Sequence, residues 1–93
     1  MALRLGAQES SYNSEMGTVR FIASVENDDV VIVAISREAL EDMAKISAAN
    51  PQALVRIAEA NRSRIEQVAQ SKWIQGVRAE FGGILIKTAD LNS

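Results

Sequence analysis

Arg62 stands between two carboxylates in the stretch of the chain that most suggests chemistry. Glu59 precedes it by three residues and Glu66 follows it by four, so a helix would bring each carboxylate next to the guanidinium. A guanidinium in this setting could bind a carboxylate or a phosphate through two parallel hydrogen bonds. The alternative, which we favour, is an ion pair within the helix whose alkyl stem packs on the core.

Asn61 falls near the middle of the apolar stripe of the same predicted helix. A buried amide without partners costs about 1 to 3 kcal/mol, so this side chain must have a partner. It either points at a ligand or ties the helix to a loop or strand end, and we favour the tie.

Trp73, with Lys72, Arg64 and Arg78, offers the residue types of an aromatic and basic nucleic-acid surface. However, Arg64 and Trp73 would lie about 180° apart around the helix, at about 100° per residue. Acidic residues also interrupt the basic positions. We therefore favour a Trp73 that covers the core or an interface.

The residue types that most catalytic and metal sites use are missing. The chain contains neither His nor Cys, so it lacks the commonest general base, a nucleophilic thiol and disulfide bonds. Catalysis would need a carboxylate or Lys with a strongly shifted pKa, and no pattern brings two such groups together. We expect no enzymatic activity, no cofactor and no metal.

Length and hydropathy indicate one soluble domain over residues 1–93. Residues 1–6 contain one Arg and lack the apolar run of about 7 to 15 residues that a signal peptide needs. The longest apolar run, residues 30–35, is far shorter than the roughly 18 residues that span a bilayer. We expect a cytoplasmic protein without membrane contact.

A long helix dominates the second half of the sequence. Asn50 and Pro51 suit a helix start, and Gly76 suits its end. A helix over residues 51–75 would be about 37 Å long, which exceeds the roughly 30 Å width of a small domain. It must bend, break near residues 61–64, or overhang.

The remaining segments alternate between strand and helix patterns. Residues 1–17 are irregular, with a possible edge strand at the start, and residues 18–26 alternate between apolar and polar. After a turn at 27–29, residues 30–35 form a second strand, Ser36 caps a short helix, and residues 84–88 form a third strand. The order strand–strand–helix–helix–strand predicts an α+β fold, an antiparallel sheet with two helices on one face.

The second face of this sheet is not polar, as the exposed face of a one-sided sheet would be. The residues that indicate this are Ile22, Val31, Val33 and Leu85. Either residues 1–12 or another chain should cover them.

Several blocks of the sequence resemble a small proteobacterial family known only as domain of unknown function 1488. They are the strand at residues 19–23, the block at 35–42 that begins Ile-Ser-Arg-Glu-Ala-Leu, the Asn-Arg-Ser-Arg-Ile-Glu block at 61–66 followed by Ala69 and Lys72, and residues 84–90. The resemblance covers about four-fifths of the chain. It implies a bacterial α+β domain and brings no established activity.

Two functions follow from these features. The first is a non-catalytic interaction module that forms a homo-oligomer or binds another protein, because the apolar strands and the long helix both call for a covering surface. The alternative is a nucleic-acid-binding accessory or regulatory protein that uses Arg56, Arg62, Arg64, Lys72 and Arg78. The first half of the chain is net acidic and the long helix with its following loop is net basic, and so mild an asymmetry more often means that the two parts attract each other than that either attracts a polyanion.

Overall fold

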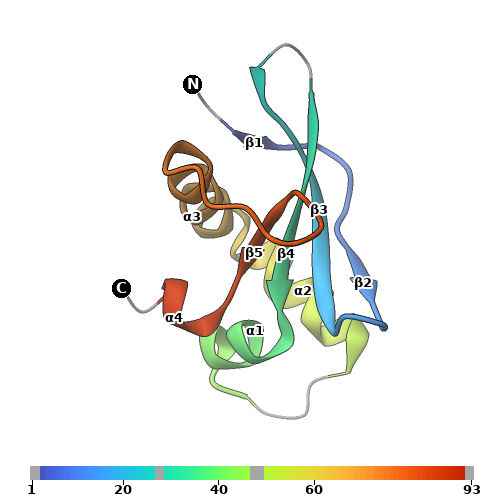
Figure 1. Cartoon of the computed structure of the whole chain (residues 1–93). Coiled ribbons are helices and arrows are strands. Elements are labelled where there is room, and N and C mark those ends of the chain that lie inside the picture. Colours follow the sequence, from blue (N-terminus) through green and yellow to red (C-terminus); the bar gives the residue numbers. More distant parts are fainter. Residues whose placement is uncertain (1–2, 27–28, 47–49, 92–93) are drawn as a thin grey trace.

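A hairpin of two seven-residue strands lies at the centre of a mixed sheet (Figure 1). The computed structural model describes residues 3–26, 29–46 and 50–91. The strands are β1 (Arg4–Leu5), β2 (Ser11–Asn13), β3 (Thr18–Ser24), β4 (Val30–Ser36) and β5 (Ile84–Ile86). The helices are α1 (Arg37–Ala44), α2 (Pro51–Ala60), α3 (Arg62–Ile74) and α4 (Thr88–Leu91). The predicted α+β class is confirmed.

The strand order is β1–β3–β4–β5, and β2 also pairs with β3. Strands β1, β2 and β4 run antiparallel to β3, but β5 runs parallel to β4. The prediction of a wholly antiparallel sheet is therefore wrong for β5. The chain leaves β4, passes through the helical layer and returns to the sheet, and a crossover of this kind brings the next strand back in the same direction.

The alternation in β3 decides which face of the sheet is buried. Val19, Phe21 and Ala23 are buried beneath the helices, whereas Ile22 points to the opposite face. The strand register continues the buried face across the sheet, because Phe21 pairs with Val33 and Val33 with Ile84. The helices contribute to this core the buried side chains Leu40, Leu54, Ala58, Ile65 and Ala69.

Both predicted helix starts are confirmed. The Ser36 hydroxyl accepts the N–H of Ala39 at 3.2 Å, and Asn50 Oδ1 accepts the N–H of Ala53 at 2.8 Å. Each side chain satisfies one of the N–H groups that a helix start leaves unpaired. The long helix breaks at Asn61, within the predicted region, into α2 and α3.

Two short elements differ from the sequence prediction. β2 lies in the segment predicted to be irregular, where three polar or aromatic residues pair with β3. The last predicted strand ends at Ile86, and Thr88 begins α4 instead. Asp90 Oδ2 accepts the N–H of Lys87 at 2.8 Å, which turns the chain into this helix.

Two predicted breaks fall partly outside the described residues. The turn at 27–29 includes residues 27 and 28, and the break before α2 includes residues 47–49. On the described side of the turn, the N–H of Val25 donates to the carbonyl of Asp29 at 3.0 Å.

Gly83 directly precedes β5, and its substitution tests how closely the backbone there approaches β4. A Cβ at this position would overlap the carbonyl oxygen of Ile32. We expect Gly83→Ala to lower the free energy of unfolding by about 3 kcal/mol, because backbone must move to make room. Urea denaturation would measure this change.

The neighbouring Gly82→Ala substitution is the matched control. A Cβ at Gly82 would meet no atom within 4 Å, although its φ of +87° favours glycine. We expect a loss of about 1 kcal/mol from that backbone conformation. Equal losses at both positions would contradict the close approach of β5 to β4.

Candidate functional site

The side chain of Arg62 binds the backbone of the N-terminal segment. Its Nη1 donates to the carbonyl oxygen of Gly6 at 2.6 Å, and its Nη2 donates to that of Gln8 at 3.0 Å. Both acceptors lie more than fifty residues away along the sequence. One guanidinium therefore joins the helical layer to the chain that connects β1 to β2.

Two carboxylates extend this contact in both directions. Glu59 Oε2 accepts the N–H of Ser10 at 2.7 Å, and Glu66 Oε2 accepts the N–H of Leu5 at 3.0 Å. Helix side chains thus satisfy backbone groups that the sheet leaves unpaired at these positions. We call Glu59, Arg62 and Glu66 the clasp.

Arg62 also makes the ion pair with Glu59 that its spacing predicts, whereas Glu66, the other predicted partner, accepts the N–H of Leu5 instead. Arg62 Nη2 lies 2.9 Å from Glu59 Oε1, and its guanidinium carbon lies 5.0 Å from the centre of the Phe21 ring. The second distance is within the range of cation–π attraction. These contacts agree with the favoured interpretation of an ion pair whose stem packs on the core. The bonds to residues 5–10 were missed, and the spacing of the three charges was their only signal in the sequence.

Opposing effects set the pKa of Glu59. Burial raises it, whereas the N–H and hydroxyl of Ser10 and the guanidinium of Arg62 lower it, and together they hold the pKa below its ordinary value of 4.5. Because the pKa is lower in the folded state, the carboxylate stabilises the fold above the unfolded-state pKa. That contribution is lost as the pH falls through the folded-state pKa.

Asn61 separates the two helices beside the clasp. Its φ of −112° departs from helical geometry, and its Nδ2 donates to the carbonyl of Ile57 at 2.8 Å. The amide therefore bonds to the end of α2. The prediction that this side chain ties the helix to a loop or strand end is therefore wrong, because its partner is a carbonyl group of the helix itself.

Trp73 is half-buried against the core, as one of its two favoured roles requires. The guanidinium carbon of Arg78 lies 3.5 Å from the centre of its ring, and Arg78 Nη1 donates to the carbonyl of Val77 at 3.0 Å. The contact occupies one ring face, which a stacked base would otherwise need.

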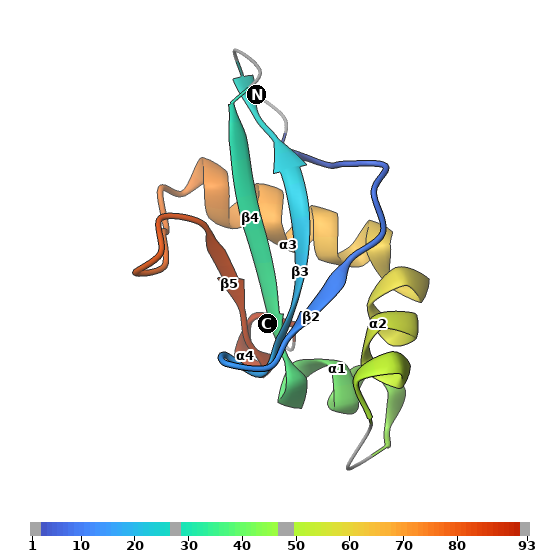
Figure 2. The same ribbon diagram turned by 90° about the vertical axis from the view of Figure 1, so that its right-hand side faces the viewer.

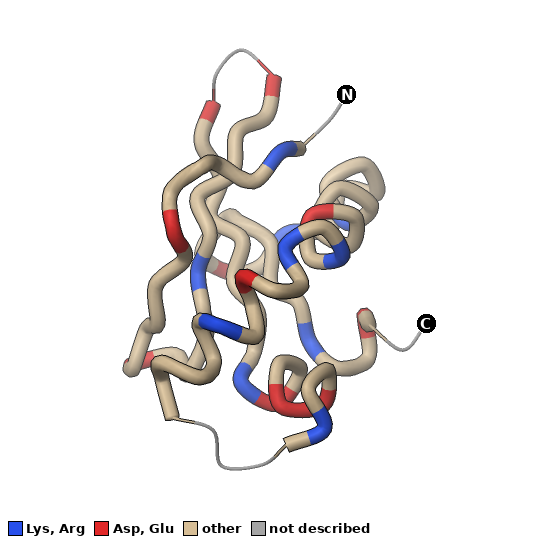
Figure 3. The backbone as a smooth tube through the Cα atoms, turned by 180° about the vertical axis from the view of Figure 1, so that it is seen from behind, with Lys and Arg blue, Asp and Glu red and all other residues tan. Residues whose placement is uncertain are grey.

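The other basic residues of α3 also have partners within the chain. Lys72 Nζ lies 2.9 Å from Asp90 Oδ1, and Arg64 Nη2 donates to the carbonyl of Leu91 at 2.6 Å. Burial raises the pKa of Asp90, but the Lys87 N–H and Lys72 outweigh it and lower the pKa. Figure 3 shows Lys and Arg dispersed over several elements with Asp and Glu between them. The described residues form no continuous basic stripe there.

Among the described residues, no helix packs on one face of the sheet. In Figure 2, β3 and β4 lie in front while α3 crosses behind them. By register, the face away from the helices is formed by Arg20, Ile22, Val30, Ile32, Ala34 and Leu85, which we call the outer face. Ile22 is 46% exposed and Val30 66% exposed, whereas Ile32 and Leu85 are partly buried and Ala34 is buried. Residues 3–12 run along the edge of the sheet and do not cover this face.

The predicted interface is only partly right about which residues share this face. Ile22 and Leu85 belong to it, but Val31 and Val33 are buried in the core beneath the helices. The strand 30–35 is apolar on both sides, so its sequence did not reveal which alternate residues point inward. The outer-face residues of β4 are Val30, Ile32 and Ala34.

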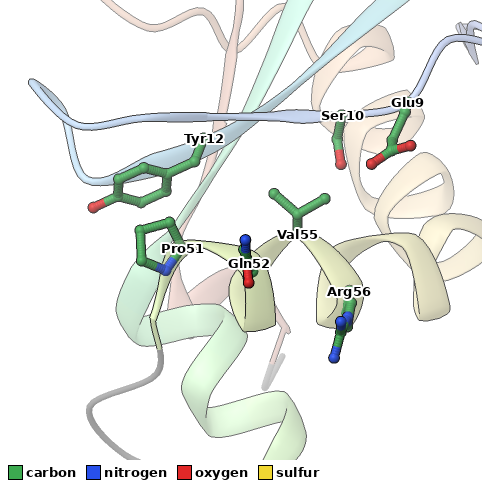
Figure 4. Close-up of a pocket in the computed structure, with 7 residues that line it drawn as sticks. All are labelled: Glu9, Ser10, Tyr12, Pro51, Gln52, Val55 and Arg56. Carbon is green, nitrogen blue, oxygen red and sulfur yellow. The ribbon is translucent and has the colours of Figure 1, made fainter.

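A groove of about 430 Å³ lies between β2 and α2 (Figure 4). It is lined by Glu9, Ser10, Tyr12, Pro51, Gln52, Val55 and Arg56, and we call it the β2 groove. The ring of Tyr12 lies over Pro51 at one end, and Glu9 and Ser10 lie at the other (Figure 4). Of these residues, only Arg56 was predicted from the sequence to bind a partner.

Within residues 3–26, 29–46 and 50–91, no three carboxylates come together in a way that could hold a metal ion. No helix of that same part of the chain has the length and apolar character needed to cross a membrane.

Comparisons with known proteins agree with the fold and bring no activity. A sequence model of the family described as "Protein of unknown function (DUF1488)" matches residues 7–86. A crystal structure of a protein of unknown function from this family, from Shewanella loihica PV-4, is similar with a TM-score of 0.81 and 20% sequence identity, and the match covers 91% of each chain. A search of curated proteins found no match. At this identity the structural likeness concerns the fold alone.

The clasp predicts a pH-dependent stability. We expect Glu59→Gln to lower the free energy of unfolding by about 1 kcal/mol at pH 7, because Arg62 loses its charged partner. The difference from the parent chain should shrink as the pH falls through the lowered pKa of Glu59, since both chains are then neutral at this position. Urea denaturation at pH 7 and at pH 3 would measure it.

Glu80→Gln is the control, because Glu80 is exposed on the loop before β5. We expect it to change the stability little at either pH. A Glu59→Gln effect that stayed the same at both pH values would contradict the charged role of this carboxylate.

Proposed function

Since the chain belongs to the family of proteins of unknown function DUF1488, a description that assigns no activity, we propose a function from its surfaces. The protein is a non-catalytic, cytoplasmic interaction module that self-associates through the outer face. The observation that carries this proposal is the exposed Ile22, directly opposite the partly buried Ile32 on the adjacent strand. No described helix covers them, and Val30 continues the apolar surface.

The outer face suits a second copy of the same chain as its cover. Sheets pack face to face through apolar side chains, and in a two-fold dimer one self-complementary face serves both copies. Residues 3–12 lie along the sheet edge, so the N-terminal segment is not the cover. A partner chain is the alternative that fits the described residues.

The size of the face predicts a weak dimer. Four strands spaced about 4.8 Å apart, of which only β3 and β4 have seven residues rising about 3.3 Å each, give a footprint of at most about 20 by 23 Å, or roughly 460 Å². This is smaller than the roughly 800 Å² per partner of a standard interface and is typical of weak, transient contacts. We expect reversible dimers with a dissociation constant of the order of micromolar.

The geometry gives less support to nucleic-acid binding, the alternative function. Four of the five basic residues proposed for it, all except Arg56, hold partners within the chain. Binding through these residues would have to break those contacts. We expect no retention on heparin at low salt, and retention that falls steeply with salt would favour the alternative.

Substitution of Ile22 tests self-association. We expect Ile22→Lys to raise the dimer dissociation constant about a hundredfold. Each of the two copies would bury an unpaired ammonium group, and a cost of about 1.4 kcal/mol per copy weakens the dimer about tenfold. Sedimentation velocity over a wide range of concentrations would detect a species of twice the 10.1 kDa chain mass and its loss in the variant.

Ile46→Lys is the matched control, because Ile46 is 47% exposed but follows α1, away from the outer face. This variant should dimerise like the parent chain. A parent chain that is monomeric at all concentrations, or a dimer that Ile22→Lys leaves intact, would overturn the proposal.

A further inference from the structure

The β2 groove lies at an unpaired strand edge. β2 pairs with β3 on one side, and within the described chain no strand pairs with its other side. The unpaired N–H and C=O groups of such an edge are a template for another strand. α2 runs alongside this edge and forms the opposite wall (Figures 2 and 4).

The direction of the backbone groups can be read from Ser10. Its N–H donates to Glu59, on the side away from β3. Successive residues of a strand direct their N–H and C=O groups to opposite edges, so Tyr12 points its groups the same way as Ser10. The N–H and C=O of Tyr12 therefore face the groove and the helix.

The clasp shows that α2 and α3 already bind extended chain at this edge. Glu59, Arg62 and Glu66 hold the backbone of residues 5–10 through charged side chains. Beyond Ser10, toward the start of α2, the helix positions that face the edge carry Gln52 and Val55 instead. The bound chain gives way there to the open groove.

The groove walls combine apolar surface with separated charges. Tyr12, Pro51 and Val55 provide the apolar surface, with Tyr12 and Val55 partly buried against the core (Figure 4). Arg56 is exposed at the rim, on the helix side, and Glu9 is exposed at the end beside Ser10.

We propose that the β2 groove binds an extended peptide segment of another protein. The segment adds to β2 as a further strand, bonds to the N–H and C=O of Tyr12, and lays an apolar side chain between Tyr12 and Val55. An acidic residue of the segment pairs with Arg56. The contact is short, because β2 has three residues. This site is separate from the outer face and goes beyond self-association.

Nuclear magnetic resonance can test the site with defined peptides. The probes are acetylated and amidated pentapeptides with Glu at both ends, Val at the second and fourth positions, and Val, Ile, Leu, Phe or Tyr at the centre. We expect at least one of them to cause saturable shifts in the amide signals of the full chain, at residues 11–13 and at Val55 and Arg56. A peptide with a methylated central amide should bind at least about tenfold more weakly, because strand addition needs that N–H.

Arg56→Glu should weaken binding of the acidic peptides about tenfold, through loss of a charge-assisted bond. Arg4→Glu is the matched control, because Arg4 is also an exposed arginine but lies on β1, outside the groove. It should leave the binding unchanged.

Three results would overturn the proposal. They are no shifts at millimolar concentrations of any of the peptides, equal binding of the methylated peptide, and shifts that centre on Ile22 and Ile32. The last result would assign peptide binding to the outer face. None of them depends on whether the chain dimerises, since the Ile22→Lys chain can be titrated in the same way.

Discussion

The Arg62 guanidinium is the point at which three parts of the molecule meet. It belongs to α3, bonds to the carbonyls of Gly6 and Gln8, and lies over the ring of Phe21 in β3. A planar group with five fixed donors can hold several acceptors at once, which an ammonium on a flexible stem does less well. The helical layer, the sheet and the N-terminal segment thus share one contact. The course of the chain from β1 to β2 depends on it.

The sequence predicted the parts of the fold that rest on local chemistry. Ser36 and Asn50 as helix caps, the break at Asn61 and the alternation in β3 all follow from residue type and spacing. The parallel pairing of β5 with β4 did not, because three apolar residues in a row suit either direction. Neither did the inward orientation of Val31 and Val33. Both depend on contacts between segments far apart in the sequence, which a pattern within one segment does not contain.

Contacts between distant segments also explain why the sequence revealed some functional surfaces and not others. Arg62 and Glu66 stood out as charged residues at helical spacing, but their partners are backbone atoms of a segment with no pattern of its own. The β2 groove combines an edge strand too short to be recognised with one helix face. By contrast, the apolar outer face was visible at Ile22 and Leu85, because isoleucine and leucine at positions that alternate away from the core need an explanation.

The break at Asn61 gives the two helices different tasks. α2 flanks the sheet edge beside β2, while α3 crosses behind the strands (Figure 2). The rotation of each helix about its axis is nevertheless fixed relative to the other, because clasp residues on either side of the break bind the same short segment. Adding or removing one residue between Glu59 and Glu66 would turn the following side chains by about 100° and separate the clasp from the backbone groups it binds. Changes in chain length should therefore be tolerated in the loops around this helix pair and not within it.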